Sequence, residues 1–453
     1  MDESPGPSPT APLRAGLDAA RVGFADLVRA RFPALLSRNY RLYWVGQGLS
    51  LIGTWMQSVA VGWLVWRLSH SPFLLGLVGV AGTLPILAFS LYAGVVADRF
   101  VRRRVILVTQ VLAMAQAFTL AALVTFGTPR VEVVLALVAV GGLINAFDLP
   151  ARQSFVSETV DRAVLPNAIA LHSTIFNAAR LLGPALAGLV LATLGEAPCF
   201  WINALSFVAV LWGLLRMDLP EHKPAPSRTS ALAHMIEGVR YAWGDSRLRN
   251  LLLLLGTAGS IGFQYTVLLP VYAGKLLHRW GSTVAPAEGA GAGGYGLLLS
   301  ALGVGSLIAA LVMTRKQDRW RLRRNVLVGL ALFGAALVAF SQNRIFELAV
   351  AINAVAGFGM ILYAASTNTL VQLTVEESFR GRIMSLYTLM FVGTAPAGSF
   401  VLGAVAERFG APVATMISGL TCAAGATWVF FRLRTLARRE APVPPSAAAP
   451  GPA

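Results

Sequence analysis

Apolar residues are concentrated in twelve runs, six before and six after a charged segment at residues 218–249. Each run is about as long as the ~20 residues that an α-helix needs to cross the hydrocarbon core of a bilayer. Because lipid offers no hydrogen-bond partner to a bare peptide group, runs of this length are expected to form helices packed in a bundle. The expected spans are 42–66, 74–97, 104–126, 131–150, 167–192, 199–216, 250–274, 295–314, 325–341, 346–367, 383–405 and 413–431.

The pattern predicts an all-α membrane protein with twelve transmembrane helices. The expected division of the chain is a cytoplasmic N-terminal tail with an interfacial amphipathic helix (1–38), a first six-helix bundle (39–217), a cytoplasmic connector (218–249), a second six-helix bundle (250–433) and a disordered Pro/Ala-rich tail (434–453). The tail at the start carries arginines between apolar residues at roughly helical spacing, which favours a helix lying on the inner leaflet.

Composition and charge agree with this fold class. Hydrophobic residues make up 56% of the chain and charged residues 13%, about half of the charged fraction of a soluble domain. The net charge of +16 raises the question of nucleic-acid binding. However, 30 of the 37 Lys and Arg lie in the two tails and in the connections that follow the second, fourth, sixth, eighth and tenth spans, all of which are expected on one side of the membrane. This positive-inside bias predicts cytoplasmic termini. We therefore explain the positive net charge by the orientation of the chain in the membrane and by contact with anionic lipid, rather than by nucleic-acid binding.

The two halves of the chain are related in sequence. Residues 131–190 match residues 346–405 without gaps at a shift of 215, and the shared acidic and glycine positions carry most weight because apolar matches arise by chance. Six spans repeated in the same orientation predict two pseudo-symmetric bundles around a central cavity, the architecture of a transporter. The acidic and glycine pairs among the matches are Glu132/Glu347, Gly142/Gly357, Gly183/Gly398 and Gly188/Gly403.

The connection after the second span contains a distinctive motif. Gly94 is small enough for close helix approach, Asp98 can accept hydrogen bonds from backbone N–H groups at a helix start, and arginines follow at Arg99, Arg102, Arg103 and Arg104. This segment resembles the G-x-x-x-D-R-x-x-R-R/K loop of the major facilitator superfamily. The resemblance implies the fold of that superfamily.

The fifth span reads Arg180-Leu-Leu-Gly183-Pro184-Ala-Leu-Ala-Gly188. It resembles the G-P-x-x-x-G motif associated with export branches of the same superfamily, although ordinary packing of small residues and a proline bend would also explain it. Segments beginning at Asn39, Gly53, Asn145 and Leu165 are similar to the bacterial branch that includes enterobactin exporters and related efflux permeases. The resemblance implies an exporter of the inner membrane driven by the proton-motive force.

Polar residues within the spans are the candidate substrate site. Arg180 lies near the middle of the fifth span, where a charge is costly unless it faces water or a partner. Either it faces the cavity and binds an anionic or catecholate-like group, or it is a structural residue satisfied within the bundle. The resemblance implies that spans one, four, seven and ten line the cavity, which adds Gln57, Asn145, Gln264, Tyr265 and Asn353.

No acidic residue lies clearly at the middle of a span, so the sequence does not identify a proton carrier. Asp148, near the inner end of the fourth span, is expected to pair with Arg99, Arg102 or Arg152 at a cytoplasmic gate. Glu132 and Glu347 are expected at helix starts, where the helix dipole favours a negative charge.

These features predict a secondary active exporter of a small amphipathic molecule, such as a siderophore, drug or metabolite, with protons as the coupling ion and lipids as neighbours. Proton-coupled uptake remains an alternative because alternating access works in either direction, and a membrane scaffold or sensor is a third class. No Walker A loop, HExxH or GxSxG motif is present, so neither an enzyme nor ATP-driven transport is indicated. We expect a monomer without cofactor or metal.

Overall fold

The computed structural model describes residues 31–219, 231–278, 290–314 and 318–440. These residues contain twelve helical segments that are long and apolar enough to cross a membrane, and the predicted fold class is thereby confirmed. The expected interfacial helix of the N-terminal tail and the last residues of the C-terminal tail lie outside the described residues.

Six helices form the first half of the molecule, each with one membrane-length segment. They begin and end as follows: α2 (Arg38–Ser69), α3 (Pro72–Arg99), α4 (Arg102–Phe126), α5 (Val131–Phe155), α6 (Leu165–Leu194) and α7 (Ala197–Arg216). Serine side chains cap α2 and α3, because Ser37 accepts a hydrogen bond from the Tyr40 N–H and Ser71 from the Leu74 N–H.

The second half has the same number of spans, but two of them are composite. The seventh span passes from α9 (Ser246–Thr257) through a π-helical turn (Ala258–Gly262) and a 3₁₀ segment (Phe263–Leu268) into α10 (Leu269–His278). The eleventh passes from α14 (Arg380–Thr388) through a π-helical turn (Leu389–Gly393) into α15 (Ala395–Phe409). The remaining spans are α11 (Ala290–Met313), α12 (Arg319–Gln342), α13 (Phe346–Thr374) and α16 (Ala411–Glu440).

The two π-helical turns lie against each other. A Cβ on Gly259 would lie 3.0 Å from the backbone oxygen of Phe391, so any larger residue would push the two turns slightly apart. Hydropathy predicted two continuous helices here, because a π-helical turn leaves the apolar period almost unchanged. Such turns occur frequently at functional sites.

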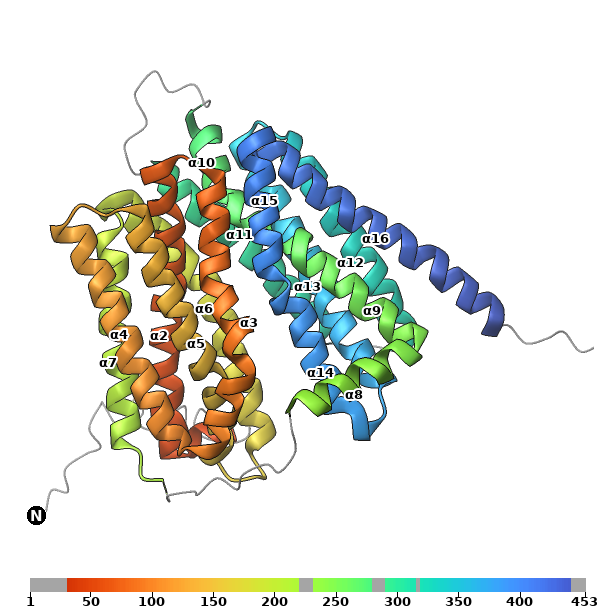
Figure 1. Cartoon of the computed structure of the whole chain (residues 1–453), viewed down its shortest axis with the longest axis horizontal. Helices are drawn as coiled ribbons and strands as arrows, with labels where there is room; N and C mark the ends of the chain where they lie inside the picture. Colours follow the sequence, from red (N-terminus) through yellow and green to blue (C-terminus); the bar gives the residue numbers. More distant parts are fainter. Residues whose placement is uncertain (1–30, 220–230, 279–289, 315–317, 441–453) are drawn as a thin grey trace, which may run out of the picture.

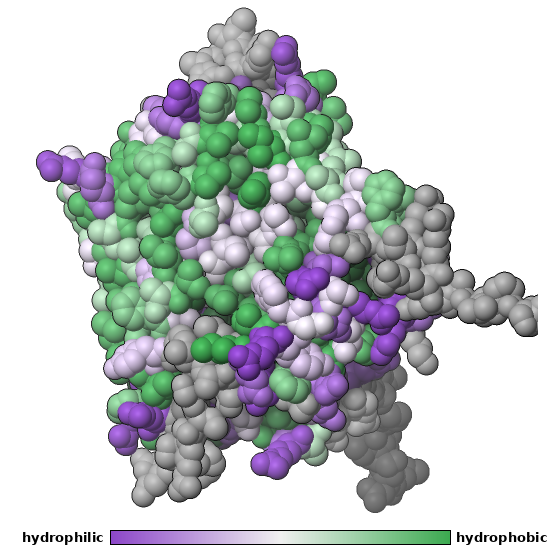
Figure 2. Space-filling model, turned by 45° about the vertical axis from the view of Figure 1, so that its right-hand side comes forward, coloured by the Kyte–Doolittle hydropathy of each residue, from purple (hydrophilic) through white to green (hydrophobic). Residues whose placement is uncertain are grey.

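The segment between the halves carries a further helix, α8 (Ala231–Gly244), which packs on α14 and is followed closely by α9. We call the face of the molecule that carries α8 the α8 face and the opposite one, where α10 ends, the α10 face (Figure 1). Figure 2 shows apolar residues over much of the side of the molecule, with hydrophilic residues concentrated in its lower part, toward the α8 face. This is the surface of a protein that is surrounded by lipid.

The glycines that repeat in the sequence occupy equivalent contacts in the two halves. Gly142 on α5 packs against the backbone of α3, and Gly357 on α13 packs against the backbone of α11. Gly183 on α6 packs against α2, and Gly398 on α15 packs against Ser260 in the π-helical turn of the seventh span. The sequence match between the halves therefore preserves places where two helix backbones come close together.

The last repeated pair joins the halves to each other. Gly188 on α6 lies against Gly296 on α11, and Gly403 on α15 lies against Gly76 on α3. A Cβ on Gly188 would lie 2.8 Å from the Cα of Gly296, and a Cβ on Gly76 would lie 2.9 Å from the Cα of Gly403. All four glycines lie in the parts of their helices near the α10 face, where the halves are tightly packed.

Toward the α8 face, α3 separates from the eleventh span, which continues there as α14 (Figure 1). A Cβ on Gly94, near the end of α3, or on Gly381, at the start of α14, would meet no atom of another described segment within 4 Å. The expectation that Gly94 allows close helix approach is therefore wrong for this conformation. Its position on α3 lies beyond the point where the two halves part, so no helix packs against it.

Candidate functional site

A cationic and aromatic cluster lies on the first half where it faces the second. The guanidinium carbon of Arg180 lies 5.9 Å from the centre of the Trp55 ring, and Phe176 packs edge-on against Trp55 at 6.2 Å between ring centres. Phe176 is 43% exposed, and Trp55 and Arg180 are half-buried. An arginine over an aromatic face keeps its charge available to a second, anionic group. We call Arg180, Trp55 and Phe176 the Arg180 cluster.

The G-P segment of α6 positions this cluster. A side chain at Gly183 would collide with the Cβ of Trp55, so the glycine makes room for the indole on α2. Phe176 and Arg180 are four residues apart and therefore lie on one face of α6. Gly188, two turns further along, packs on α11 of the other half. The G-P segment of α6 thus positions the Arg180 cluster and also forms the nearby contact between the two halves.

Gln57 lies in a different place from the one expected. Its amide donates to Gln116 Oε1 at 3.1 Å and accepts from Asn203 Nδ2 at 2.8 Å, which joins α2 to α4 and α7 within the first half. An α-helix turns by about 100° per residue, so Gln57 and Trp55 point in nearly opposite directions. The expectation that Gln57 lines the central cavity is wrong, and Trp55 is the residue of that segment in the cluster.

Tyr265 and Asn353 form a buried pair in the second half. The Tyr265 hydroxyl donates to Asn353 Oδ1 at 2.7 Å, and Asn353 Nδ2 donates to the Leu298 carbonyl at 2.6 Å. Both side chains have 0% exposure, so they connect the seventh, eighth and tenth spans rather than face open solvent. Tyr265 is also close enough to Arg180 for an electrostatic interaction. The structure thereby brings two of the predicted residues together across the two halves.

Gln264 lies at a junction of both halves. Its Oε1 accepts from the Ser399 hydroxyl at 3.0 Å, and that serine contacts Gly79 on α3. Asn145 is half-buried on α5, and no hydrogen bond of its side chain is recorded within the described part of the chain. The predicted cavity residues therefore divide into those near the contact between halves (Arg180, Gln264 and Tyr265) and those elsewhere.

Asp148 is the centre of a buried polar network. It forms an ion pair with Arg152 at 2.5 Å and accepts hydrogen bonds from Thr109 at 2.7 Å and Gln110 at 3.1 Å. Arg152 also donates to Gln47 Oε1 at 3.0 Å. Of the three arginines considered from sequence, Arg152 is the partner. The network ties α5 to α2 and α4 and does not reach the second half in this conformation.

The arginines of the loop motif also contact their own half. Arg102 pairs with Glu158 at 2.6 Å, and Arg103 donates to the Leu215 carbonyl at 3.3 Å. Arg99 is exposed. The side chain of Asp98 lies outside the described part of the structure. Residues 318–324 of the second half repeat its Asp-Arg pair and the following Arg-Arg pair at a shift of 220, and there Asp318 caps α12 by accepting from the Arg321 N–H at 2.7 Å.

A carboxylate that sequence reasoning did not single out joins the halves at the α10 face. Glu407 at the end of α15 accepts from the Ser71 hydroxyl at 2.8 Å and from the Phe73 N–H at 3.1 Å. It thus stands at the start of α3, where the partial positive charge of a helix N-terminus stabilises an anion. Only the tertiary contact between α3 and α15 indicates this role, because Glu407 follows an ordinary apolar run.

No cluster of three or more His, Cys, Asp or Glu side chains that could hold a metal ion is found among the described residues. The sequence model of the transmembrane secretion effector family, a branch of the major facilitator superfamily, matches residues 30–452. The chain belongs to this family. The resemblance drawn from the loop and G-P motifs is confirmed.

Relatives of this chain include efflux and siderophore transporters. The multidrug efflux pump Tap of Mycolicibacterium fortuitum is 29% identical over 371 residues, which cover 79% of this chain and 87% of Tap. The staphyloferrin A transporter of Staphylococcus aureus (strain NCTC 8325 / PS 47) is 26% identical over 382 residues, or 82% and 91% of the two chains. The enterobactin exporter EntS of Citrobacter koseri is 24% identical over 415 residues, or 91% and 95%.

Solved structures support the fold. The crystal structure of the nucleoside transporter NupG superimposes with a TM-score of 0.69 at 12% identity, covering 87% of this chain and 99% of NupG. At this identity the likeness concerns the fold alone. The chain therefore combines the architecture of the superfamily with its own polar residues at the contact between the halves.

Proposed function

We propose that this protein exports a small amphipathic molecule across the bacterial inner membrane by alternating access, driven by the proton-motive force. The α8 face is the cytoplasmic face in this proposal, because the connections expected there carry most of the Lys and Arg. Both chain termini are then cytoplasmic, and the conformation described is closed to the outside.

One observation carries the proposal. The helix pairs α3–α15 and α6–α11 are packed glycine against glycine near the α10 face, whereas a Cβ on Gly94 or Gly381, near the α8 face, would meet no other described segment within 4 Å. Two halves that meet at one face only form one end state of an alternating-access cycle. The opposite end state requires the glycine contacts to part, which rigid-body rocking of the halves achieves without unfolding either of them.

The Arg180 cluster supplies the substrate class. A cation over an indole, next to a partly exposed phenyl ring, suits a molecule with an aromatic or apolar body and an anionic or catecholate-like group. The named substrates of two relatives, staphyloferrin A and enterobactin, are siderophores. We infer that a siderophore, or a drug of the same amphipathic type, binds against the Arg180 cluster, whose Phe176 is partly exposed.

Transport into membrane vesicles tests the proposal. We expect candidate siderophores to accumulate in inverted vesicles with an acid interior, and collapse of the pH gradient by an uncoupler to reduce accumulation to the level of vesicles that lack the protein. Accumulation only in right-side-out vesicles would identify an uptake permease instead. A rate that ignores the pH gradient in both orientations would reject proton coupling.

Substitution of Arg180 tests the binding site. We expect Arg180→Ala to lower efflux by about tenfold, because a desolvated cation–π and ionic contact of ~1–2 kcal/mol would be lost, and Arg180→Lys to give an intermediate rate. The measurement is efflux from cells at equal amounts of protein in the membrane. Thr174→Ala is the matched control, because Thr174 is exposed on α6 and donates only to its own helix at Ala170. Equal efflux in all variants would remove Arg180 from the mechanism.

A further inference from the structure

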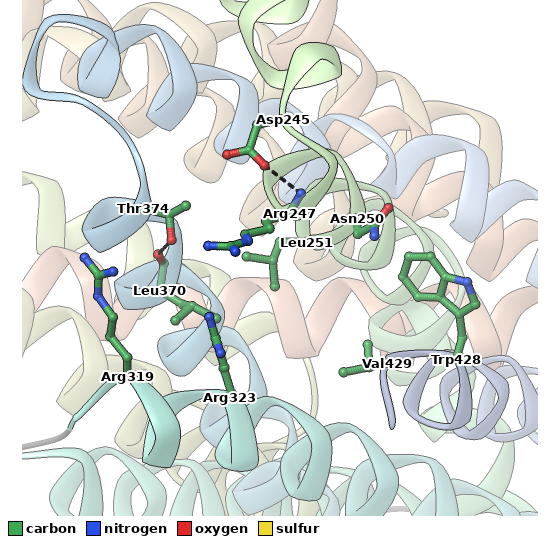
Figure 3. Close-up of a pocket in the computed structure, with 10 residues that line it drawn as sticks. All are labelled: Asp245, Arg247, Asn250, Leu251, Arg319, Arg323, Leu370, Thr374, Trp428 and Val429. Atoms are coloured by element: carbon green, nitrogen blue, oxygen red, sulfur yellow. Dashed lines mark hydrogen bonds between the residues drawn. The ribbon is translucent and has the colours of Figure 1, made fainter. Parts of the chain in front are cut away.

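A cavity separate from the contact between the halves opens at the α8-face end of the second half. It lies among four helices and has a volume of about 230 Å³, well above the ~10–15 Å³ that a single water molecule needs on the same measure. Figure 3 shows its lining side chains converging on a common space. The described lining residues are Asp245, Arg247, Asn250 and Leu251 from the start of α9, Arg319 and Arg323 from α12, Leu370 and Thr374 from the end of α13, and Trp428 and Val429 from α16.

Three arginines and one aspartate make the described lining positive. The aspartate is engaged with the backbone, because Asp245 Oδ1 accepts from the Arg247 N–H at 2.7 Å as the cap of α9 (Figure 3). Arg319 donates to the Leu373 carbonyl at 2.9 Å, which holds its guanidinium at the rim. Arginine presents a planar set of donors that matches the oxygens of a phosphate group better than a lysine does.

The rest of the lining is amphipathic. Leu370 and Val429 are buried and form an apolar wall, and Leu251 adds a half-buried side chain. Trp428 is 38% exposed at the other side of the cavity. Tryptophan is enriched where a membrane protein passes from hydrocarbon to water. The cavity thus offers cations and apolar surface at the depth where lipid headgroups lie. These headgroups belong to the inner leaflet in the orientation proposed above, with the α8 face cytoplasmic.

We propose that this cavity binds a phosphate group, and that the phosphate is the headgroup of an anionic phospholipid of the inner leaflet. Basic pockets between transmembrane helices on the cytoplasmic side suit such headgroups, whereas a soluble phosphorylated compound would leave the apolar wall unused. The bound headgroup bridges the starts of α9 and α12 and holds them to the end of α13 and to α16 at Trp428 and Val429. The inference takes the orientation of the α8 face from the proposed function, but it does not depend on which substrate is transported.

Native mass spectrometry of the full chain tests the proposal with phosphatidylglycerol as the probe and phosphatidylcholine as the neutral comparison. We expect retained phosphatidylglycerol on the natural protein and at least about tenfold weaker retention on the double variant Arg319→Gln/Arg323→Gln, since each basic residue near anionic lipid contributes ~1 kcal/mol. The matched control is Arg321→Gln/Arg324→Gln on the same helix. It removes the same charge, but Arg321 faces Asp318 and Arg324 covers the Trp320 ring.

A second arm distinguishes the two sources of phosphate. Melting temperature in detergent is measured with inorganic phosphate or glycerol 3-phosphate against chloride at the same ionic strength. Stabilisation by these solutes that the pocket variant loses and the control keeps, without retention of phosphatidylglycerol, would support a phosphate site for a soluble ligand. Binding of neither class, or equal losses in the pocket and control variants, would overturn the proposal.

Discussion

Replacing Gly296 with alanine is expected to abolish efflux while leaving the protein folded in the membrane. A Cβ at this position would lie 2.7 Å from the Gly188 nitrogen and 2.9 Å from the Pro184 carbonyl oxygen, and backbone atoms within two helices cannot yield as side chains do. Overpacking of this kind costs ~1–3 kcal/mol, which changes a conformational equilibrium by roughly 5- to 150-fold. The strain is relieved only when α6 and α11 separate, so the variant should favour the state open at the α10 face.

Cross-linking of Ser71→Cys to Glu407→Cys by a short bifunctional thiol reagent reports this closure, because the two natural side chains are in hydrogen-bond contact at 2.8 Å and the reagent replaces the length that the shorter cysteine lacks. The pair is introduced into a chain whose buried Cys199 and Cys422 are replaced by alanine. We expect rapid cross-linking with Gly296 and slow cross-linking with Gly296→Ala. Gly141→Ala is the control, because its Cβ would meet only the amide of Gln116 at 3.6 Å. Unchanged cross-linking and efflux in Gly296→Ala would contradict the assigned contact.

Replacing Asp148 with alanine is expected to destabilise the first half by about 3–5 kcal/mol, because the Arg152 charge would remain without its ionic partner in a buried network. The Asp148 side chain is 6% exposed and that of Arg152 18%. Thr109 and Gln110 would lose their acceptor as well. The measurement is the melting temperature in detergent, together with the fraction of protein that remains monodisperse after purification.

Glu377→Ala is the comparison for this prediction. Glu377 also forms an ion pair within one helical turn, with Arg380 at 3.6 Å, but its side chain is 91% exposed, and exposed pairs contribute about 0–1 kcal/mol. The double variant Asp148→Ala/Arg152→Ala should recover part of the lost stability, since no unpaired charge remains. If Asp148→Ala and Glu377→Ala melt at the same temperature, the buried network has no special importance.

The spans were predicted well because each depends on its own residues. Whether a run of apolar side chains can cross lipid is decided by its own length and composition. The repeated glycines could also be recognised from the sequence, and they mark close backbone contacts that are present in both halves. The π-helical turns at Ala258–Gly262 and Leu389–Gly393 were not predicted, because they change the hydrogen-bond register without changing hydropathy.

The candidate site was predicted only in part. Arg180 was identified because a charge in an apolar run demands a partner, and Tyr265 was found on a span expected to line the cavity. Trp55 and Phe176 were missed although Trp55 lies in a segment that had been noted. An aromatic side chain in a membrane helix is indistinguishable from core or lipid-facing residues until the rotation of the helix is known, and the choice of Gln57 was wrong for the same reason.

By itself the sequence determined the number of membrane crossings, the relation between the halves and the family. These properties depend on composition within one segment or on the comparison of segments, and both can be read along the chain. Only the tertiary structure decided that Trp55 rather than Gln57 accompanies Arg180, that Glu407 holds α3 to α15, and that the halves meet at the α10 face. These properties depend on how each helix is rotated about its axis and on which of two packings the halves adopt. The rotation and the packing are both determined by contacts between residues that are far apart in the sequence.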